Sequence, residues 1–430
     1  MTKVNQTETD LSRRQFLKNS SRAVAGAVAL SQFPLVQTGR AAPDDPIRIA
    51  LVGAGGRGGG AAQNALEAGT ILNSSSPNVK LVAVADIFPE PLAAARKNFP
   101  DVPESNCFSG WDAYKKALAL PEVNYVILAT PPGFRPMQAR AAIEAGKHVF
   151  MEKPVAVDGP GVRSILETAE LAKKKGLSMV AGTQRRHHAR YIETIKRIQD
   201  GAIGDIIAMR AYWNGNAIWH KGYDPSKSEM ENQVRNWYHY RWLSGDHYVE
   251  QHMHNIDVCN WVMNAHPLRA YGLGGRQALG DKTGHIWDHF AVEYEYAGGA
   301  RMYSQARQIS GTDGRVLEGI DGTKGSSNPS ATIQATGASR WASNAKFVNP
   351  YVQEHVDLMK AIRSGEALNE GKTIAESTLT AIMGRESAYC GQTIEWDEVM
   401  ESKTVLMPEK LEWGPAPKWE VPMPGKYKLT

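Results

Sequence analysis

Glu152 and Lys153 stand where the chain leaves a short apolar run, residues 148–151, and Pro154 follows them. Such a run is typical of a buried parallel strand, and a proline cannot continue the hydrogen-bond ladder of a strand. The two charged residues therefore mark the carboxyl end of a strand, which is the edge where open α/β sheets bind ligands. By themselves they are equally consistent with a surface ion pair before a turn, so the elements around them decide between the two interpretations.

A second set of ionisable residues has intervals of three and four: His247, Glu250, His254 and Asp257. On one helix these intervals place the side chains along one face, with His252 pointing away. We expect such a face to line a site of acid–base chemistry rather than a core. The first three residues would also suit zinc, and the choice depends on whether the chain binds another cofactor.

A glycine loop with GxGxxG spacing follows the first predicted strand, residues 47–52, and precedes an Ala-rich helical stretch. Its glycines allow a tight turn, the approach of backbone amides to a pyrophosphate, and close packing of the helix on the strand. The order of strand, glycine loop and helix predicts a dinucleotide site. The loop residues predicted to bind the cofactor are Gly53, Gly55, Gly56, Arg57 and Gly58.

Asp86 follows the next predicted strand, residues 80–85, at the position of a carboxylate that accepts hydrogen bonds from the adenosine ribose. A loop insertion at residues 73–77 accounts for its long separation from the glycine loop. Ile87 and Phe88 come next, so no arginine follows Asp86 to meet a 2′-phosphate. The predicted cofactor is therefore NAD, with NADP less favoured.

Strands and helices alternate through residues 46–183, with further strands predicted at 125–129 and 178–181. This order is typical of a doubly wound parallel sheet, the Rossmann form of an α/β domain. A second domain, residues 184–405, contains a predicted hairpin at 289–305 and helices between 351 and 390 that can pack back on the first domain. Residues 311–345 are rich in loop signals. A Pro-rich tail, residues 406–430, completes the chain.

Residues 1–41 resemble a twin-arginine export signal, because Arg13, Arg14 and the following Phe-Leu-Lys precede an apolar run. The run is too short and too weakly apolar for a stable membrane anchor, although a retained anchor is the alternative. We therefore expect export to the periplasm by the twin-arginine machinery. This segment holds six Lys and Arg and two Asp and Glu, so it accounts for the whole formal charge of +4. The remainder is formally neutral, which argues against nucleic acid as a partner.

Three cysteines, Cys107, Cys259 and Cys390, are scattered without the spacing of a metal knuckle or a disulfide framework. We interpret them as buried structural thiols. One disulfide with one free thiol is the alternative in an oxidising compartment.

Together these motifs resemble the Gfo/Idh/MocA family of NAD(P)-dependent sugar and polyol oxidoreductases. The resemblance rests on the glycine loop, Asp86, Ala129-Thr130-Pro131-Pro132 and Glu152-Lys153-Pro154, each after a predicted strand. It implies that Lys153 is the catalytic lysine, that Glu152 contacts the nicotinamide ribose, and that Thr130 and Pro131 line the cofactor site. It also implies a cis peptide bond before Pro154. Arg135 departs from the family, whose members often have histidine at this position.

In the same family the second domain is an α+β unit with an open, mostly antiparallel sheet that often pairs with its twin. The resemblance thus implies a homo-oligomer through this sheet. It implies that His254 works with Lys153 in proton transfer and that Glu250, where the family has aspartate, holds a substrate hydroxyl. Since family members mostly work without metal and nicotinamide supplies the electrophile, no metal is expected.

Tyrosine and tryptophan are dense between residues 212 and 242. Some of these rings must belong to the core or to an interface, but flat rings also stack on the apolar face of a sugar. The residues predicted to contact a carbohydrate substrate are Trp213, Trp237, Tyr240, His247 and Asp257.

An alcohol carbon gives up hydride only as its hydroxyl loses a proton, so a base must lie close to that oxygen. A free lysine is a poor base at neutral pH because its pKa is about 10.4; burial and the neighbouring His254 are expected to help. The predicted function is NAD-dependent hydride transfer on a sugar, polyol or glycoside, with a tightly held cofactor that is recycled internally. Two alternatives stay open: an NAD-dependent glycoside hydrolase that oxidises, eliminates and re-reduces, and a non-catalytic sugar-binding or scaffold protein.

Overall fold

The computed structural model describes residues 46–73, 78–280, 283–418 and 420–430. The predicted export signal, residues 1–41, and most of the predicted loop insertion lie outside these ranges. Within them, none of the helices combines the length and apolarity that crossing a bilayer requires.

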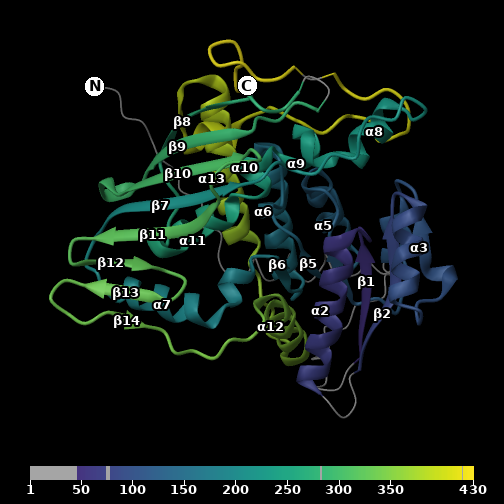
Figure 1. Cartoon of the computed structure of the whole chain (residues 1–430). Helices are drawn as coiled ribbons and strands as arrows, with labels where there is room; N and C mark the ends of the chain where they lie inside the picture. Colours follow the sequence, from purple (N-terminus) through teal and green to yellow (C-terminus); the bar gives the residue numbers. More distant parts are fainter. Residues whose placement is uncertain (1–45, 74–77, 281–282, 419) are drawn as a thin grey trace, which may run out of the picture. The chain divides into compact units, whose positions relative to one another are not determined.

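A six-stranded parallel sheet forms the first domain, in the strand order β3-β2-β1-β4-β5-β6 (Figure 1). This confirms the predicted doubly wound sheet. Its strands are β1 (Ile47–Val52), β2 (Val79–Asp86), β3 (Cys107–Ser109), β4 (Tyr125–Leu128), β5 (His148–Met151) and β6 (Met179–Ala181). The helices between them are α2 (Gly56–Leu72), α3 (Pro89–Asn98), α4 (Ala113–Leu118), α5 (Arg135–Glu144) and α6 (Gly159–Lys174).

Both faces of this sheet are covered, and this explains why its strands read as continuous apolar runs. Ile49 and Leu51 of β1 belong to a core with α2 and α12 (Pro350–Ser364), whereas Ala50 and Val52 belong to the core on the other face. Alternate side chains of a strand point to opposite faces. The carboxyl edge of the sheet is thereby held between two packed layers.

The second domain is built on nine strands in the order β14-β13-β12-β11-β7-β10-β9-β8-β15. All neighbours are antiparallel except β7 and β10, which confirms the predicted, mostly antiparallel sheet. The strands are β7 (Ile206–Gly215), β8 (Arg269–Gly275), β9 (His289–Glu295), β10 (Arg301–Gln308), β11 (Arg315–Gly322), β12 (Gly325–Asn328), β13 (Thr332–Ala335), β14 (Trp341–Ala342) and β15 (Thr393–Glu395). Four of them, β11 to β14, lie in the stretch that its composition had marked as loop-rich.

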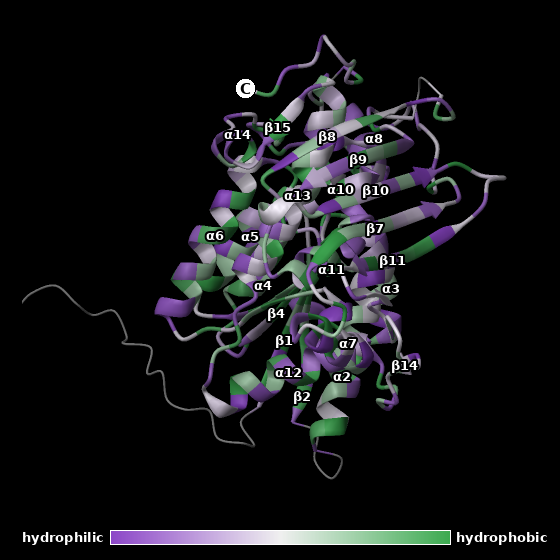
Figure 2. Ribbon diagram, turned by 90° about the vertical axis from the view of Figure 1, so that its left-hand side faces the viewer, coloured by the Kyte–Doolittle hydropathy of each residue, from purple (hydrophilic) through white to green (hydrophobic). Residues whose placement is uncertain are grey.

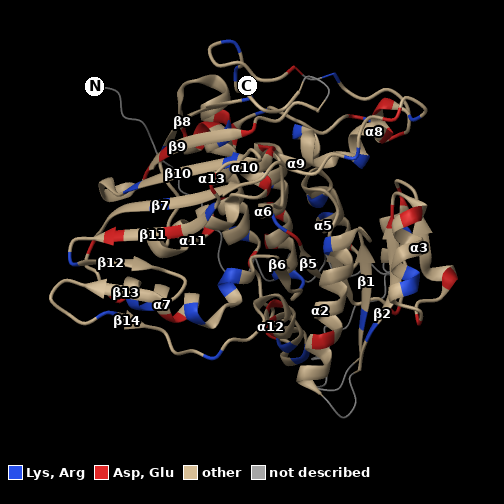
Figure 3. Ribbon diagram, viewed as in Figure 1, with Lys and Arg blue, Asp and Glu red and all other residues tan. Residues whose placement is uncertain are grey.

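Helices cover one face of this sheet, and hydrophobic and hydrophilic residues alternate along its strands (Figure 2). The helices of the second domain are α7 (Ala189–Gln199), α8 (Glu229–Arg235), α9 (Arg241–Ser244), α10 (His247–Glu250), α11 (Met253–Met263), α12, α13 (Gly371–Cys390) and α14 (Trp396–Glu401). Several of them also reach the first domain, since α12 packs on α2, and α13 and α14 pack on α6. Acidic and basic residues are interspersed over both domains in the view of Figure 3.

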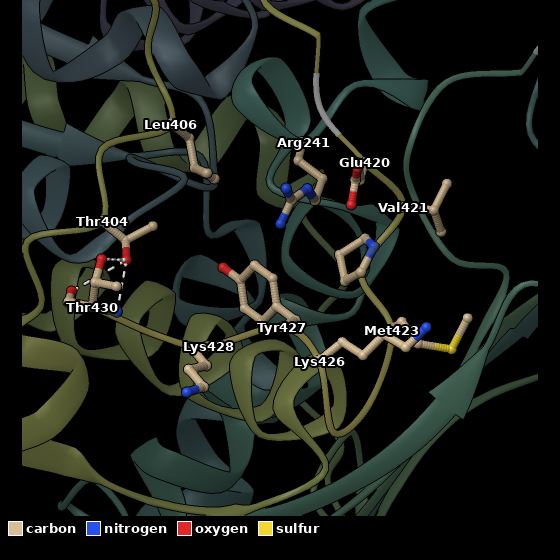
Figure 4. A pocket seen from close by; sticks show the side chains of 11 residues that line it. Arg241, Thr404, Leu406, Glu420, Val421, Met423, Lys426, Tyr427, Lys428 and Thr430 are labelled. Atoms are coloured by element: carbon tan, nitrogen blue, oxygen red, sulfur yellow. Dashed lines mark hydrogen bonds between the residues drawn. The ribbon is translucent and has the colours of Figure 1, made fainter.

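The tail beyond α14 folds back on itself (Figure 4). The backbone oxygen of Thr430 accepts hydrogen bonds from the amides of Lys403 and Thr404, at 2.7 and 3.0 Å. A cavity of about 420 Å³ between these segments is lined mainly by the tail itself, together with Arg241.

The three cysteines are free thiols. Cys259 and Cys390 are buried as expected, whereas Cys107 is only half-buried.

Candidate active site

A cavity of about 600 Å³ lies where the loops after β1, β4 and β5 face the second domain. Ten of the residues predicted from the sequence line it: Gly55, Gly56, Arg57, Thr130, Pro131, Glu152, Lys153, Trp237, Glu250 and His254. The others lie outside its lining: Gly53, Gly58, Asp86, Trp213, Tyr240, His247 and Asp257. The motifs around Lys153 and His254 therefore meet at one cavity.

The glycine loop has the shape that a dinucleotide requires. Gly53 has φ +93°, and a Cβ on Gly58 would lie 1.8 Å from the Gly53 carbonyl oxygen, so neither position accepts a side chain. In contrast, a Cβ on Gly55 or Gly56 would meet nothing within 4 Å. Strand and helix are thus in tight contact behind the loop, while its front is open to a pyrophosphate at the start of α2. The residues present fit the cofactor that the sequence predicted.

Asp86 fixes the same loop from the end of β2. Its carboxylate accepts hydrogen bonds from the Ala54 and Phe88 amides, at 2.7 and 2.9 Å. Burial raises the pKa of this carboxyl group, and the amide bonds oppose that shift. The side chain stands at the strand end where a ribose hydroxyl would be recognised.

Arg57 joins the glycine loop to two carboxylates. Its guanidinium lies 2.5 Å from Glu152 and 3.4 Å from Glu354 of α12, and it covers the ring of Tyr351 at 4.9 Å. Glu354 is fully buried, and burial, together with the nearby Glu152, raises its pKa well above the ordinary value. Sequence patterns had not indicated Glu354 or Tyr351, because α12 lies about 300 residues away from the loop that it supports.

Lys153 projects from the end of β5 into the cavity. Its Nζ donates to the Glu250 backbone oxygen and lies 3.2 Å from the Glu250 carboxylate. Both residues are 8% exposed, and Glu250 Oε2 has no hydrogen-bond partner among the described residues. The peptide bond before Pro154 is cis, as the resemblance implied. A buried amine thus stands beside a buried carboxylate.

His254 stands in the same cavity, with its ring stacked on Trp213 at 6.0 Å between centroids. Burial lowers its pKa well below 6.5, and the positive charges of Lys153 and Arg185 lower it further. The imidazole is therefore neutral at neutral pH.

Arg135, which replaces the family's frequent histidine, lies underneath the Lys153–Pro154 turn. It is 4% exposed and donates to the backbone oxygens of Pro154 and Thr130, the latter at 2.7 Å. Burial lowers its pKa to about 10. The arginine ties the loops after β4 and β5 together.

The single helix expected for residues 247–257 is wrong. The segment forms two helices, α10 and α11, and residues 251–252 separate them. His247 is consequently fully buried against Phe290, and neither of its ring nitrogens has a hydrogen-bond partner among the described residues. The proposed face of acid–base residues is in fact split between the cavity and the core.

Asp257 and Tyr240 also lie in the interior rather than at the cavity. Asp257 accepts three hydrogen bonds from Arg186 and a fourth from Ser377, and Tyr240 packs edge-on against His285. Trp213 stands behind His254 rather than at the lining. Of the five predicted substrate contacts only Trp237 lines the cavity, where Trp219, Lys221 and Gln251 join it.

Among the described residues, no group of three His, Cys, Asp or Glu side chains is arranged to hold a metal ion. The suggested zinc ligand His247 does not share the cavity with Glu250 and His254.

Comparison with known sequences agrees with this geometry. The profile described as an oxidoreductase family with an NAD-binding Rossmann fold matches residues 47–183, and the profile of the GFO/IDH/MocA C-terminal domain matches residues 191–327. The chain belongs to the Gfo/Idh/MocA family. The cofactor of its Rossmann domain is accordingly NAD, as predicted.

Relatives within and around this family have several activities. A glycosyl hydrolase family 109 protein of Shewanella amazonensis is 24% identical over 243 residues, which are 53% of this chain and 50% of that protein. Inositol 2-dehydrogenase/D-chiro-inositol 3-dehydrogenase of Lactiplantibacillus plantarum is 28% identical over 197 residues, 45% of this chain and 53% of that protein. The chain thus spans about half the length of the curated relatives that it matches.

Among solved structures, aldose-aldose oxidoreductase from Caulobacter crescentus, complexed with glycerol, has a TM-score of 0.64 and 18% identity. The match covers 81% of this chain and 99% of that chain. At this identity the likeness shows the fold alone.

Proposed function

We propose that this family member oxidises or reduces a sugar, polyol or glycoside by hydride transfer. The observation that carries the proposal is the buried Lys153, held beside Glu250 and near His254 in the cavity that the glycine loop also lines. Bound NAD supplies the hydride acceptor. The chain's own residues supply the rest, namely orientation of the substrate and removal of its hydroxyl proton.

Each side chain has a role that follows from its contacts. Glu250 fixes the Lys153 ammonium group and leaves Oε2 to accept a substrate hydroxyl. Neutral His254 takes up the proton that leaves during oxidation and returns it during reduction. Glu152 and Arg57 neutralise each other next to the glycine loop, so a ligand there meets ordered polar groups rather than an unpaired charge.

The test is to incubate the purified protein with a panel of free sugars, polyols and glycosides while following cofactor absorbance and released aglycone. A change in absorbance with a free sugar or polyol supports the proposal. No response of either signal across the panel contradicts it, and would favour the non-catalytic alternative.

The glycosidase is the second candidate, and the similarity to glycosyl hydrolase family 109 proteins favours it. Transient oxidation at one carbon would acidify its neighbour, the glycosidic oxygen would leave by elimination, water would add at the carbon it left, and the carbonyl would then be re-reduced. Aglycone release without net change in cofactor absorbance distinguishes this reaction from simple dehydrogenation.

Export by the twin-arginine route is part of the proposal, and the motif around Arg13 and Arg14 supports it. A periplasm without a free nicotinamide pool would stop an enzyme that released NADH in each cycle. The cofactor should therefore stay bound and be recycled by a second sugar or within one glycoside. Export of the double variant Arg13→Lys/Arg14→Lys would contradict the targeting assignment.

Preference for NAD over NADP is supported by the charges around Asp86. Arg235 of α8 is a cation close to this end of the site, since it covers the Phe88 ring at 4.0 Å, but it is already paired with Glu90 and Glu231. Asp86→Ala should weaken NAD binding and narrow the gap to NADP. Tighter binding of NADP by the wild type in calorimetry would contradict the assignment.

Pairing of two chains through the open face of the nine-stranded sheet is the proposed oligomer. Tyr271, Glu293 and Tyr303 are opposite one another on three adjacent strands, and both tyrosines are about half exposed. Exposed apolar surface of this kind marks association sites. Tyr303→Glu should reduce the mass measured by light scattering; a wild type that is already monomeric would contradict the proposal.

A further inference from the structure

Residues 402–416, here called the strap, run from α14 along the carboxyl edge of the parallel sheet (the yellow coil that reaches α8 in Figure 1). The start of the strap is held by α6 and its cap. Arg163 donates to the Ser402 backbone oxygen at 3.1 Å, and the Leu406 amide donates to Asp158 at 2.8 Å. Leu406 is 1% exposed. The strap is therefore a packed element and not a loose end.

The middle of the strap crosses the loop after β4. A Cβ built on Gly133 would lie 2.9 Å from Met407 Sδ and 2.1 Å from the backbone oxygen of Trp242. The loop thus needs a glycine where the strap and α9 press against it.

The far part of the strap reaches the loops after β2 and β3. The Trp413 ring stacks on Phe88, with centroids 5.6 Å apart, and meets Trp111 at 4.8 Å. The Met230 amide of α8 donates to the Gly414 oxygen at 3.0 Å. Arg235 of the same helix lies over the Phe88 ring, 4.0 Å from the ring centroid.

These contacts bracket the adenosine side of the dinucleotide groove. Phe88 comes two residues after Asp86, and in doubly wound sheets the carboxylate at this position meets the adenosine ribose. Trp111 Nε1 is a buried donor without a hydrogen-bond partner among the described residues. An aromatic cluster and a donor without a partner among the described residues therefore lie next to the strand end that carries Asp86.

We propose that the strap is part of the cofactor site: Trp413, with Phe88 and Trp111, closes the adenosine side and slows dissociation of the dinucleotide. This inference rests on the proposed function, since it gives the retained cofactor a structural cause. The glycine loop and Asp86 provide ordinary recognition, and the strap adds retention.

The experiment measures the rate at which bound NADH leaves the full-length protein, from the loss of its fluorescence after mixing with excess NAD. Trp413→Ala removes an aromatic contact of the proposed site. It should therefore release NADH at least about 10-fold faster than the wild type. The matched control is Trp341→Ala. Trp341 is partly buried, with Arg197 over its ring at 4.4 Å, whereas Trp413 is 43% exposed; Trp341 belongs to β14 at the far edge of the other sheet. Trp341→Ala should release NADH at the wild-type rate.

Equal release rates for Trp413→Ala and wild type would overturn the proposal, and so would equal acceleration by the two tryptophan variants. Hydrogen exchange of the Met230 amide is a second readout that needs no variant: it should slow when NADH is added, and unchanged exchange contradicts the proposal. A wild type that purifies without dinucleotide refutes the retained cofactor of the proposed function, whereas the effect of Trp413 on added NADH still decides the role of the strap.

Discussion

The two walls of the active-site cavity are built in different ways. On the sheet side, loops leave the ends of β1, β4 and β5, and their paths are set by backbone requirements such as Gly53 and the turn at Lys153–Pro154. On the other side, Trp219, Lys221 and Trp237 present side chains from coil and a short turn. The first wall holds Lys153 and the glycine loop. Glu250 and His254 of the second domain complete the proposed acid–base set, and Trp219, Lys221 and Trp237 are left to contact the substrate. Changes to the first wall should reduce turnover or folding, and changes to the second should alter substrate binding.

The largest expected effect is that of Lys153→Met. Turnover should fall by at least about 100-fold, the usual size of lost acid–base help, while NAD stays bound. Lys147→Met is the matched control. Lys147 is also 8% exposed, but it lies at the opposite end of β5, where it donates to the backbone oxygens of Val123 and Leu120. Steady-state kinetics should find near wild-type kcat for this control. An equal loss of kcat in both variants would show that loss of any buried lysine has this effect, and would contradict a specific role of Lys153.

The backbone requirement of the first wall is tested by two neighbouring glycines. Gly58→Ala places a Cβ 1.8 Å from a carbonyl oxygen and should destabilise the protein by about 1–3 kcal/mol or more. Gly59→Ala meets nothing within 4 Å inside α2 and should stabilise it by about 0.5–1 kcal/mol. Urea unfolding measures both free energies. An unchanged free energy of unfolding for Gly58→Ala would contradict the tight packing of the loop against α2.

The second wall is tested by Trp237→Ala. KM should rise by about 10-fold, equivalent to about 1.4 kcal/mol of lost contact, with kcat almost kept. Tyr240→Phe, at a ring that lies outside the cavity, serves as the control and should leave both constants unchanged. A fall in kcat without a change in KM for Trp237→Ala would show that the two walls do not divide the work in this way.

The smallest effect concerns the interior of the second domain. Burial lowers the pKa of both His247 and His252 to about 3, against 6.5 in an unfolded chain. The unfolded chain therefore binds more protons between these values, and stability falls as the pH falls below about 6.5, by up to about 1.4 kcal/mol per histidine and pH unit. His247→Leu should make this slope shallower in urea unfolding at pH 5–7. An unchanged slope would place His247 in contact with solvent.

The same contrast explains which parts of the site the sequence predicts. The motifs of the first wall are local. The glycine spacing, a carboxylate at a strand end and Lys153-Pro154 each indicate the backbone geometry of the residues next to them. The acid–base residues of the second domain were predicted from helical periodicity, which assumed no break at residues 251–252. Asp257 is held in the interior by Arg186, 71 residues away, and Nε2 of His252 is bonded to Ser304, 52 residues away. The spacing of residues along one helix cannot reveal partners that are so distant in the sequence.

Strand prediction failed for a related reason. The strands β11 to β14 include short polar segments, such as Gly325–Asn328, that pair only because the longer β7 and β11 offer them an edge. Their sequences contain little alternation, so only the assembled sheet identifies them.

We propose that the cavity shared by the glycine loop, Lys153 and His254 works with a dinucleotide that stays bound. The most direct measurement is to denature the purified wild-type protein and assay the supernatant for nicotinamide dinucleotide, before and after turnover. The account predicts close to one dinucleotide per chain, in the same oxidation state at both times. A cofactor-free preparation that needs stoichiometric added NAD and releases NADH would contradict it.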